Sequence, residues 1–313
     1  MKKRGKVTSV LFIVIGLFFC LTGIFVQKAD ADTDFKFQPR ASVGWIDYTL
    51  EIESSDSLAW MDWELSDSMA VGTIGATFFL SKFYLDLSYQ HTAKGHTGIS
   101  GGTFLEAGDN PYIPLDADVT IVGSNKFYHW NYAITIGYQL LDNLSLYAGY
   151  KKNETSFDVD TQAIDHLIDD GSLTGTPGFP IFFTYIGDFD IDYEAKGPFL
   201  GGTYGFIIGD KGVLSLNLAV AFLEGDIRQS GKYIDPRTGI PDDVFNLDSS
   251  GDSIGLSYGI GWRSTLTDRL GYFLSLKGYN YDFDADNSNQ SDFKETTYQF
   301  SIGLSYSFHF KSI

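Results

Sequence analysis

The chain has 313 residues, of which 40 are Asp or Glu and 22 are Lys or Arg, so its formal net charge is −18. Binding to nucleic-acid phosphates needs clustered Lys and Arg, and this charge balance therefore argues against a nucleic-acid partner. The single cysteine, Cys20, excludes disulfides within the chain and metal sites that need several thiolates.

The first 31 residues have the features of a secretory signal peptide. Basic residues precede an apolar run over residues 7–26, and Ala29-Asp30-Ala31 follows as a small-x-small cleavage site. We expect residues 1–31 to be cleaved and residues 32–313 to form a single domain. A retained membrane anchor is the alternative, because the apolar run is close in length to a spanning helix. Cleavage would remove five basic residues and one acidic residue, which changes the net charge from −18 to −22.

Apolar and polar residues alternate in ten segments of the remaining chain. Alternation with a period of two is typical of β-strands that have one apolar and one polar face. In chain order the segments cover residues 35–45, 74–80, 83–89, 128–140, 144–150, 200–208, 214–222, 254–262, 270–276 and 296–310. Two residues separate the second segment from the third, and a turn at Asp142-Asn143 separates the fourth from the fifth. Connections this short permit only antiparallel hairpins.

The last of these segments, residues 296–310, alternates over more residues than the roughly 9 to 11 that a tilted strand needs to cross a bilayer. Its apolar positions are Tyr298, Phe300, Ile302, Leu304, Tyr306, Phe308 and Phe310. Such a segment resembles the closing strand of Gram-negative outer-membrane barrels, which the barrel-assembly machinery recognises. The resemblance implies a location in the cell outer membrane, where lipid and lipopolysaccharide would surround the protein.

We therefore predict an all-β fold, a closed antiparallel transmembrane β-barrel of about ten strands. Closure is the only way in which a sheet in lipid avoids unpaired edges. Short turns should face the periplasm and long loops the extracellular side. Aromatic residues near both ends of the segments fit two interfacial girdles. Twelve strands are the alternative, if residues 182–194 pair separately.

Several segments change phase on their loop side. In the sixth segment the apolar positions are odd over residues 183–193 and even over residues 200–208, with Gly197 and Pro198 between them. We interpret this change as a β-bulge, which would keep one apolar outer face and turn the intervening acids inward. The same interpretation applies around Gly278 and after Trp45. It predicts an acidic vestibule at the outer mouth, formed by Asp47, Glu51, Glu53, Asp62, Glu64, Asp188, Asp190, Asp192, Glu194 and Asp282.

Carboxylates that converge in a vestibule would attract a divalent cation or another cationic ligand. The alternative is that these acids only keep the strand rims soluble. Four further acids have the ligand spacing of a twelve-residue calcium loop: Asp284, Asp286, Asp292 and Glu295. Asn289 stands where the turn glycine of such a loop belongs, so an EF-hand is not expected. Ca²⁺ is the one cofactor that the sequence suggests, and a chance match of an acidic loop is the alternative.

The histidines do not indicate a catalytic site. We expect His129 and His309 to face the lumen, where a histidine is more often part of a packed polar network than a catalyst. No catalytic residue is predicted.

Short matches point to one family. Met-Asp-Trp-Glu at 61–64, Ala-Gly-Tyr at 148–150 and Tyr-Ile-Asp-Pro at 233–236 resemble the omptins, outer-membrane aspartyl proteases that cleave near basic residues at an acidic extracellular groove. The resemblance implies an omptin-like barrel. It does not extend to the catalytic pattern, because Ser-Gly-Lys at 230–232 stands where the family has Asp-x-His. Since fold does not settle function, no active-site residue is carried over.

We therefore expect a non-enzymatic surface-binding or structural protein with an acidic extracellular vestibule. Ten strands are closer to the eight whose interior is filled by side chains than to the sixteen that leave a water channel. A narrow cation-preferring channel is one alternative, with Lys151, Arg263 and Lys277 as basic groups on the lumen side. An omptin-like protease with an atypical site is the other.

Overall fold

The computed structural model describes residues 35–53, 63–92, 98–105, 117–169, 179–234, 241–286 and 292–310, and the expected signal peptide lies outside these ranges. The strands are β1 Phe35–Glu53, β2 Trp63–Leu80, β3 Phe83–Thr92, β4 Gly98–Leu105, β5 Ala117–Leu141, β6 Leu144–Asp169, β7 Phe179–Ile207, β8 Val213–Ile234, β9 Pro241–Thr265, β10 Leu270–Ala285, β11 Asp292–Tyr306 and β12 Phe308–Phe310. A short 3-10 turn, Gly209–Lys211, lies between β7 and β8. Within the described ranges no helix is both long and apolar enough to cross a membrane.

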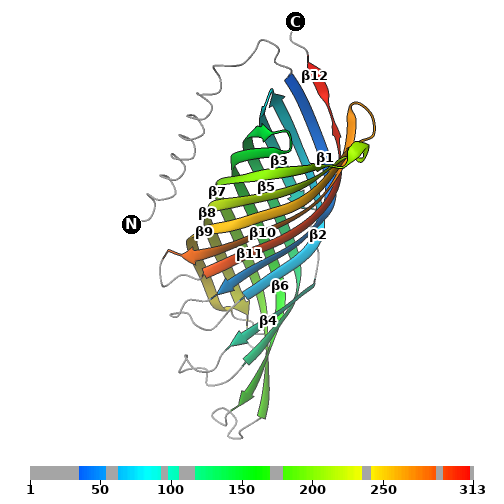
Figure 1. The fold of residues 1–313 in the computed structure, drawn as a ribbon. Coiled ribbons are helices and arrows are strands. Elements are labelled where there is room, and N and C mark those ends of the chain that lie inside the picture. Colours follow the sequence, from blue (N-terminus) through cyan, green and yellow to red (C-terminus); the bar gives the residue numbers. More distant parts are fainter. Residues whose placement is uncertain are drawn as a thin grey trace.

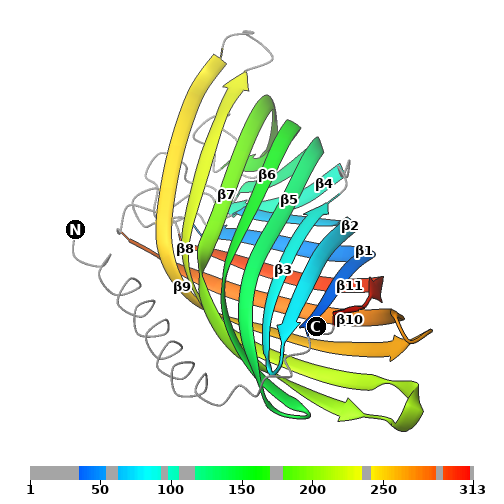
Figure 2. The same cartoon turned by 90° about the horizontal axis from the view of Figure 1, so that it is seen from above.

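The strands form one antiparallel sheet that closes on itself (Figures 1 and 2). Closure occurs where β11 pairs with β1, from Arg40↔Ser305 to Glu53↔Asp292. β3 and β4 pair with successive parts of β5, and β11 and β12 pair with successive parts of β1. The twelve strands therefore occupy ten positions around the ring. The predicted closed ten-stranded barrel is confirmed.

Tight turns join strands at one end of the barrel. The turn at residues 81–82 joins β2 to β3, and the turn at residues 142–143 joins β5 to β6. Between β7 and β8, Gly212 has a φ of 141°, in a region that favours glycine. A Cβ atom there would also lie 2.4 Å from the carbonyl oxygen of Arg263. Both two-residue turns agree with the sequence prediction.

β6 and β7 extend far beyond the membrane. They contain 26 and 29 residues, whereas a tilted strand needs only about 9 to 11 residues to cross the hydrocarbon. Their pairing is continuous from Leu144↔Tyr204 to Asp169↔Phe179. Most of residues 153–187, which lie between the fifth and sixth segments expected from the sequence, is therefore part of a long hairpin.

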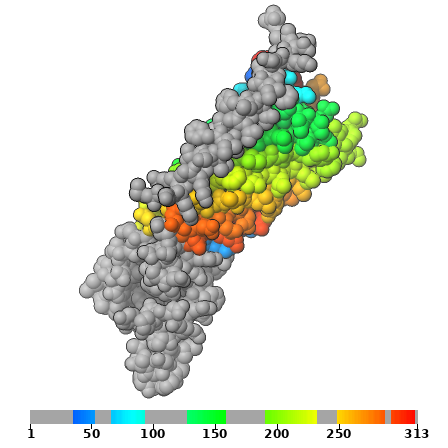
Figure 3. Space-filling view, turned by 60° about the vertical axis from the view of Figure 1, so that its left-hand side comes forward, coloured from blue at the N-terminus to red at the C-terminus, as the bar shows by residue number. Residues whose placement is uncertain are grey.

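The turn-side half of the barrel has an apolar outer face. Val43, Trp45 and Ile302 have exposed fractions of 66%, 54% and 49%, which is stable only where lipid covers the wall. In Figure 3, neighbouring strands form adjacent bands of colour on this wall in chain order. Aromatic side chains bound the apolar band: Trp45, Tyr150 and Tyr298 on the loop side, and Phe308 and Phe310 on the turn side.

On the loop side of this band, the inner face of the strands becomes apolar and the outer face becomes polar, although the pairing register between neighbouring strands does not change. On β1, Ile46 and Tyr48 are completely buried, whereas Asp47 between them is exposed. The ladders of β6–β7 and β10–β11 keep a constant register past Gly197 and Gly278. The predicted bulges at these two positions are therefore wrong. Where water replaces lipid outside the barrel, apolar side chains are favoured on the inner face. The apolar residues therefore shift to the other face of each strand, while the backbone pairing continues unchanged.

The apolar residues of the loop-side half fill the barrel interior. The buried cluster consists of Ile46, Tyr48, Leu50, Ile52, Met69, Val71, Phe127, Phe157, Ile191, Tyr193, Ala195, Ala221, Leu223, Ile227, Tyr281, Phe283 and Phe293. The rings of Phe127 and Phe157 meet edge to face, and those of Phe283 and Phe293 stack, each pair with centroids 4.6 Å apart. We call this cluster the interior core.

We expect Leu50→Ala to lower the free energy of unfolding by about 2–5 kcal/mol, because it leaves a cavity in the interior core. Urea unfolding in lipid vesicles, followed by tryptophan fluorescence, measures this change. Leu304→Ala is the matched control, since Leu304 is 53% exposed on the lipid face and lipid chains can fill the vacated space. Equal effects of the two substitutions would contradict an inward-facing Leu50.

Candidate functional site

The acids predicted to form a vestibule lie on the outside of the barrel. Asp192, for example, is exposed between Ile191 and Tyr193, which are 3% and 1% exposed. The same holds for other acids of the set: Asp47, Asp190 and Asp282 are exposed, and Glu51 and Glu194 are partly exposed. The predicted inward orientation is wrong for these six residues, because the strands lack the bulges on which it depended. The side chains of Glu53, Glu64 and Asp188, and the whole of Asp62, lie outside the described part of the chain.

The four acids with calcium-loop spacing do not share a face. Asp284, Asp286 and Asp292 are exposed near the loop between β10 and β11, whereas Glu295 is 1% exposed and points into the barrel. Glu295 therefore cannot complete a chelate with the other three. Among the described residues no three His, Cys, Asp or Glu side chains are grouped as metal ligands. Calcium binding by the three exposed aspartates stays a prediction.

A groove of about 730 Å³ runs along the outer wall above the aromatic girdle. Its lining includes acidic, basic and aromatic residues: Glu154, Asp192, Glu194, Asp226, Asp248, Lys196, Arg228, Tyr128 and Trp130. Beside it, Lys152 forms ion pairs with Glu154 and, at 2.9 Å, with Glu194. The acids outnumber the bases, so the groove has a negative surface.

Ion pairs in this groove change the titration of its groups. The hydrogen bond to Glu154 is the main cause that raises the pKa of Lys152, despite partial burial. Burial alone would raise the pKa of Glu194, but hydrogen bonds and charges from Lys196 and Lys152 lower it. The Lys196 Nζ to Glu194 Oε1 distance is 2.7 Å. Both charges of each pair are therefore stabilised at neutral pH.

A polar layer lies inside the barrel within the interior core, since Tyr193 and Tyr281 of the core supply two of its hydroxyl groups. The Tyr193 hydroxyl donates to Glu295 Oε2 at 2.7 Å, and Lys151 Nζ donates to the Tyr281 hydroxyl at 2.8 Å. His129 Nδ1 lies 2.8 Å from the Thr155 hydroxyl. His129 is 2% exposed and Lys151 is 5% exposed. The lumen positions predicted for these two residues are confirmed.

Burial determines the charge state of this polar layer. It raises the pKa of Glu295, against the opposing effects of the Lys151 charge and of hydrogen bonds from Tyr193 and Asn153. Burial also lowers the pKa of His129 to about 3, with the Lys151 charge as the next cause. His129 is therefore neutral at physiological pH. The layer is a structural network, because the interior core separates it from the outer surface.

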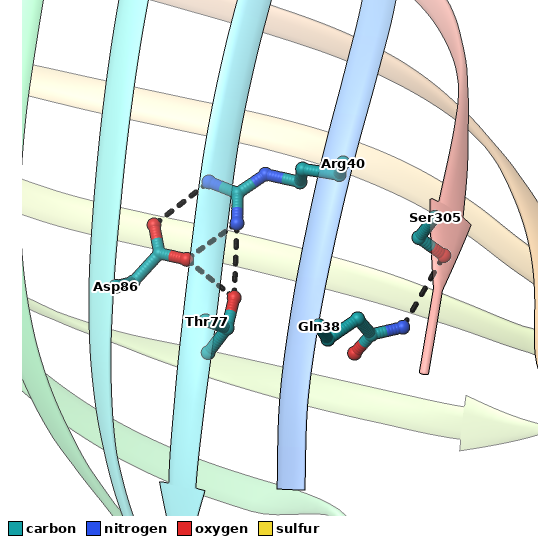
Figure 4. A network of polar contacts seen from close by, with 5 residues as sticks. All are labelled: Gln38, Arg40, Thr77, Asp86 and Ser305. Atoms are coloured by element: carbon teal, nitrogen blue, oxygen red, sulfur yellow. Dashed lines mark hydrogen bonds and ion pairs between the residues drawn. The ribbon is translucent and has the colours of Figure 1, made fainter. Parts of the chain in front are cut away.

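Charged and polar contacts continue below the layer, at membrane level (Figure 4). Arg40 donates to both carboxylate oxygens of Asp86, at 2.5 and 2.8 Å, and to the Thr77 hydroxyl at 2.9 Å. Gln38 donates to Ser305 at 3.2 Å across the closing seam. These contacts join β1 to β2, β3 and β11 inside the barrel.

No family model and no curated protein sequence matches the chain. Among solved structures, the outer membrane protease OmpT from Escherichia coli has a TM-score of 0.67 at 15% identity, over 90% of this chain and 99% of that chain. This chain is a closed β-barrel with an omptin-like fold. At this identity the similarity shows the fold alone.

Two other outer-membrane barrels match more distantly. The translocator domain of autotransporter NalP from Neisseria meningitidis has a TM-score of 0.35 at 9% identity, over 96% of this chain and 97% of that chain. The toluene transporter TodX from Pseudomonas putida has a TM-score of 0.32 at 12% identity, over 90% of each chain. Neither similarity bears on the function of the barrel.

We expect Glu295→Gln and Glu194→Gln to change stability with opposite pH dependence. The Glu295 pKa is raised in the folded state, so wild-type stability from this group falls as pH rises above the unfolded value of about 4.3. The free energy of unfolding of Glu295→Gln should therefore rise relative to that of the wild type as pH increases. The Glu194 pKa is lowered in the folded state, so the ionised Glu194 stabilises the fold at pH values above its unfolded pKa. The free energy of unfolding of Glu194→Gln should therefore fall relative to that of the wild type as pH increases.

Urea unfolding between pH 3 and pH 8 measures both differences, because the Glu194 contribution is lost only below the unfolded value of about 4.3. A stability difference between Glu295→Gln and wild type that does not change with pH would show that Glu295 titrates alike in the folded and unfolded states.

Proposed function

We propose that the protein is a non-conducting, non-enzymatic barrel of the cell outer membrane, whose extracellular wall binds cationic ligands. The interior core is the observation that carries this proposal. A pore needs a continuous polar passage, whereas apolar side chains from strands around the ring pack against one another inside the loop-side half. Solutes would have to displace this packing to pass.

The extracellular wall supplies the binding surface in this proposal. Outward acids such as Asp190, Asp192 and Asp282 extend from several strands into water, and the net charge of the whole chain is −18. Carboxylates in this arrangement favour divalent cations or basic peptides. Outer-membrane lipid and lipopolysaccharide would contact the apolar band, and the terminal strand would be recognised by the barrel-assembly machinery.

We expect no ion conductance when the purified barrel is inserted into a planar lipid bilayer in symmetrical salt. The physical reason is the apolar packing of the interior core, which leaves no hydrated path for an ion. Single-channel recording over a range of voltages measures this. A steady cation-selective current, reduced when Asp188, Asp190 and Asp192 are changed to Asn, would favour the alternative of a narrow cation channel.

We also expect Ca²⁺ and a short Lys- and Arg-rich peptide to bind the extracellular wall with a strong dependence on salt. Asp190→Asn, Asp192→Asn and Asp282→Asn together should weaken the calorimetrically measured affinity by several-fold. The matched control removes three exposed acids from the turns, with Asp142→Asn, Asp210→Asn and Asp268→Asn. Equal losses in both triple variants would contradict a site on the extracellular wall.

An omptin-like peptidase is the second candidate, and the fold similarity to the protease OmpT favours it. The same binding experiment separates the two candidates, because the peptide can be analysed by mass spectrometry after incubation with the barrel in detergent and lipopolysaccharide. Intact peptide supports the non-enzymatic proposal. Cleavage beside a basic residue would replace that proposal with the peptidase.

A further inference from the structure

A cavity of about 350 Å³ lies inside the barrel at membrane level. All ten strand positions of the ring contribute to its wall, and the polar layer and interior core lie between it and the extracellular end. Toward the turns, Arg40 contacts Asp86 and Gln38 contacts Ser305 (Figure 4). The space equals that of about twelve water molecules, at ~30 Å³ each. It is also at the lower end of the size range of small-molecule sites.

The cavity wall has an excess of positive charge. Among the described residues that line it, Asp86 is the one carboxylate, and Arg40 neutralises it with two hydrogen bonds. Lys151 and Lys277 also line the cavity. Lys151 is held by the Tyr281 hydroxyl, whereas Glu295, which acts on Lys151 electrostatically, belongs to the polar layer and not to this wall. A bound anion would balance this excess.

A buried acceptor in the same wall lacks a partner. Gln299 is 4% exposed, and its Oε1 atom has no hydrogen-bond partner among the described residues. Gln299 lies directly opposite Lys277 in the β10–β11 ladder. On the other side of Lys277 the opposite residue is Gly259, where a Cβ atom would lie 3.4 Å from the Lys277 Cγ. A buried polar atom without a partner is costly, so Gln299 indicates a missing donor beside Lys277.

The rest of the wall suits a hydroxylated molecule. Its neutral polar side chains include Ser42, Thr73, Ser88, Asn131, Asn217 and Ser275. These hydroxyl and amide groups both donate and accept hydrogen bonds. Tyr84 and Tyr147 add aromatic rings to the same wall. We propose that this cavity binds a small hydroxylated anion with the size and chemistry of a monosaccharide phosphate, which enters from the periplasmic side.

The turn-side end of the lumen supports this route. A second cavity, of about 390 Å³, is lined there by Lys36, Arg263, Arg269 and His309 together with Asp210 and Asp268. Basic residues outnumber acids in this lining as well. A mouth with one predominant sign of charge raises the local concentration of the opposite ion. Anions from the periplasm would thus meet a positive entrance before they reach Lys277.

Isothermal titration of the purified barrel in detergent micelles with glucose 6-phosphate, glucose and inorganic phosphate tests this site. Glucose 6-phosphate should bind more tightly than either of the other two, because it alone has both the anionic group and the hydroxyls. Lys277→Gln should weaken its binding by roughly tenfold or more, through the loss of a charged hydrogen-bond donor. Gln299→Leu should weaken the binding of glucose 6-phosphate more than it weakens the binding of inorganic phosphate.

Lys82→Gln is the matched control, because Lys82 lies exposed in the turn between β2 and β3, and its affinity should equal that of the wild type. Thermal unfolding of the wild-type barrel gives a second readout, since glucose 6-phosphate should raise the midpoint and glucose should not. Equal affinities in Lys277→Gln and Lys82→Gln would overturn the proposal and indicate an ion on the surface. Absence of binding and of any thermal shift would overturn it as well.

Discussion

The closed ladder of backbone hydrogen bonds is the constraint on which the rest of this structure depends. In lipid every backbone polar group must be paired within the protein, and the pairing of β11 with β1 removes the two edges that an open sheet would leave. Once the ring is closed, the register of each strand is fixed along its whole length. The long strands β6 and β7 carry the same register from membrane to water, so side chains alone can adapt to the change of solvent.

This adaptation divides the lumen into levels of different character. Above the aromatic girdle the interior is mainly apolar, since water outside favours polar residues on the outer face. The buried polar layer around Glu295 and Lys151 lies at the transition, where each of these two groups forms a hydrogen bond with a tyrosine hydroxyl. At membrane level the interior is polar and contains a cavity, because the apolar side chains lie on the outer wall in contact with lipid. The interior is therefore apolar where water surrounds the barrel and polar where lipid surrounds it.

The sequence predicted the strands and their number but not the direction of the acids. Alternation identifies two faces, yet it does not tell which face is inside when the outer solvent changes along a strand. The alternation of Ile46, Tyr48, Leu50 and Ile52 with polar residues was the available signal for an interior core. The contacts of the polar layer had no such signal, because Tyr193 and Glu295 are 102 residues apart and meet only in the closed ring. The spacing of Glu295 in the sequence therefore indicated an acid of a calcium-binding loop and not a buried residue.

The seam between β1 and β11 also has a consequence for biosynthesis. The first strand finds its second partner only when the last ones, β11 and β12, are present. Phe35 and Phe37 of β1 pack against Phe310 and Phe308 of β12, with ring centroids 5.6 and 5.9 Å apart. Until then a nascent chain carries two unsatisfied edges that can pair with other chains. Such a topology favours keeping the polypeptide apart from its neighbours until β11 and β12 have paired with β1.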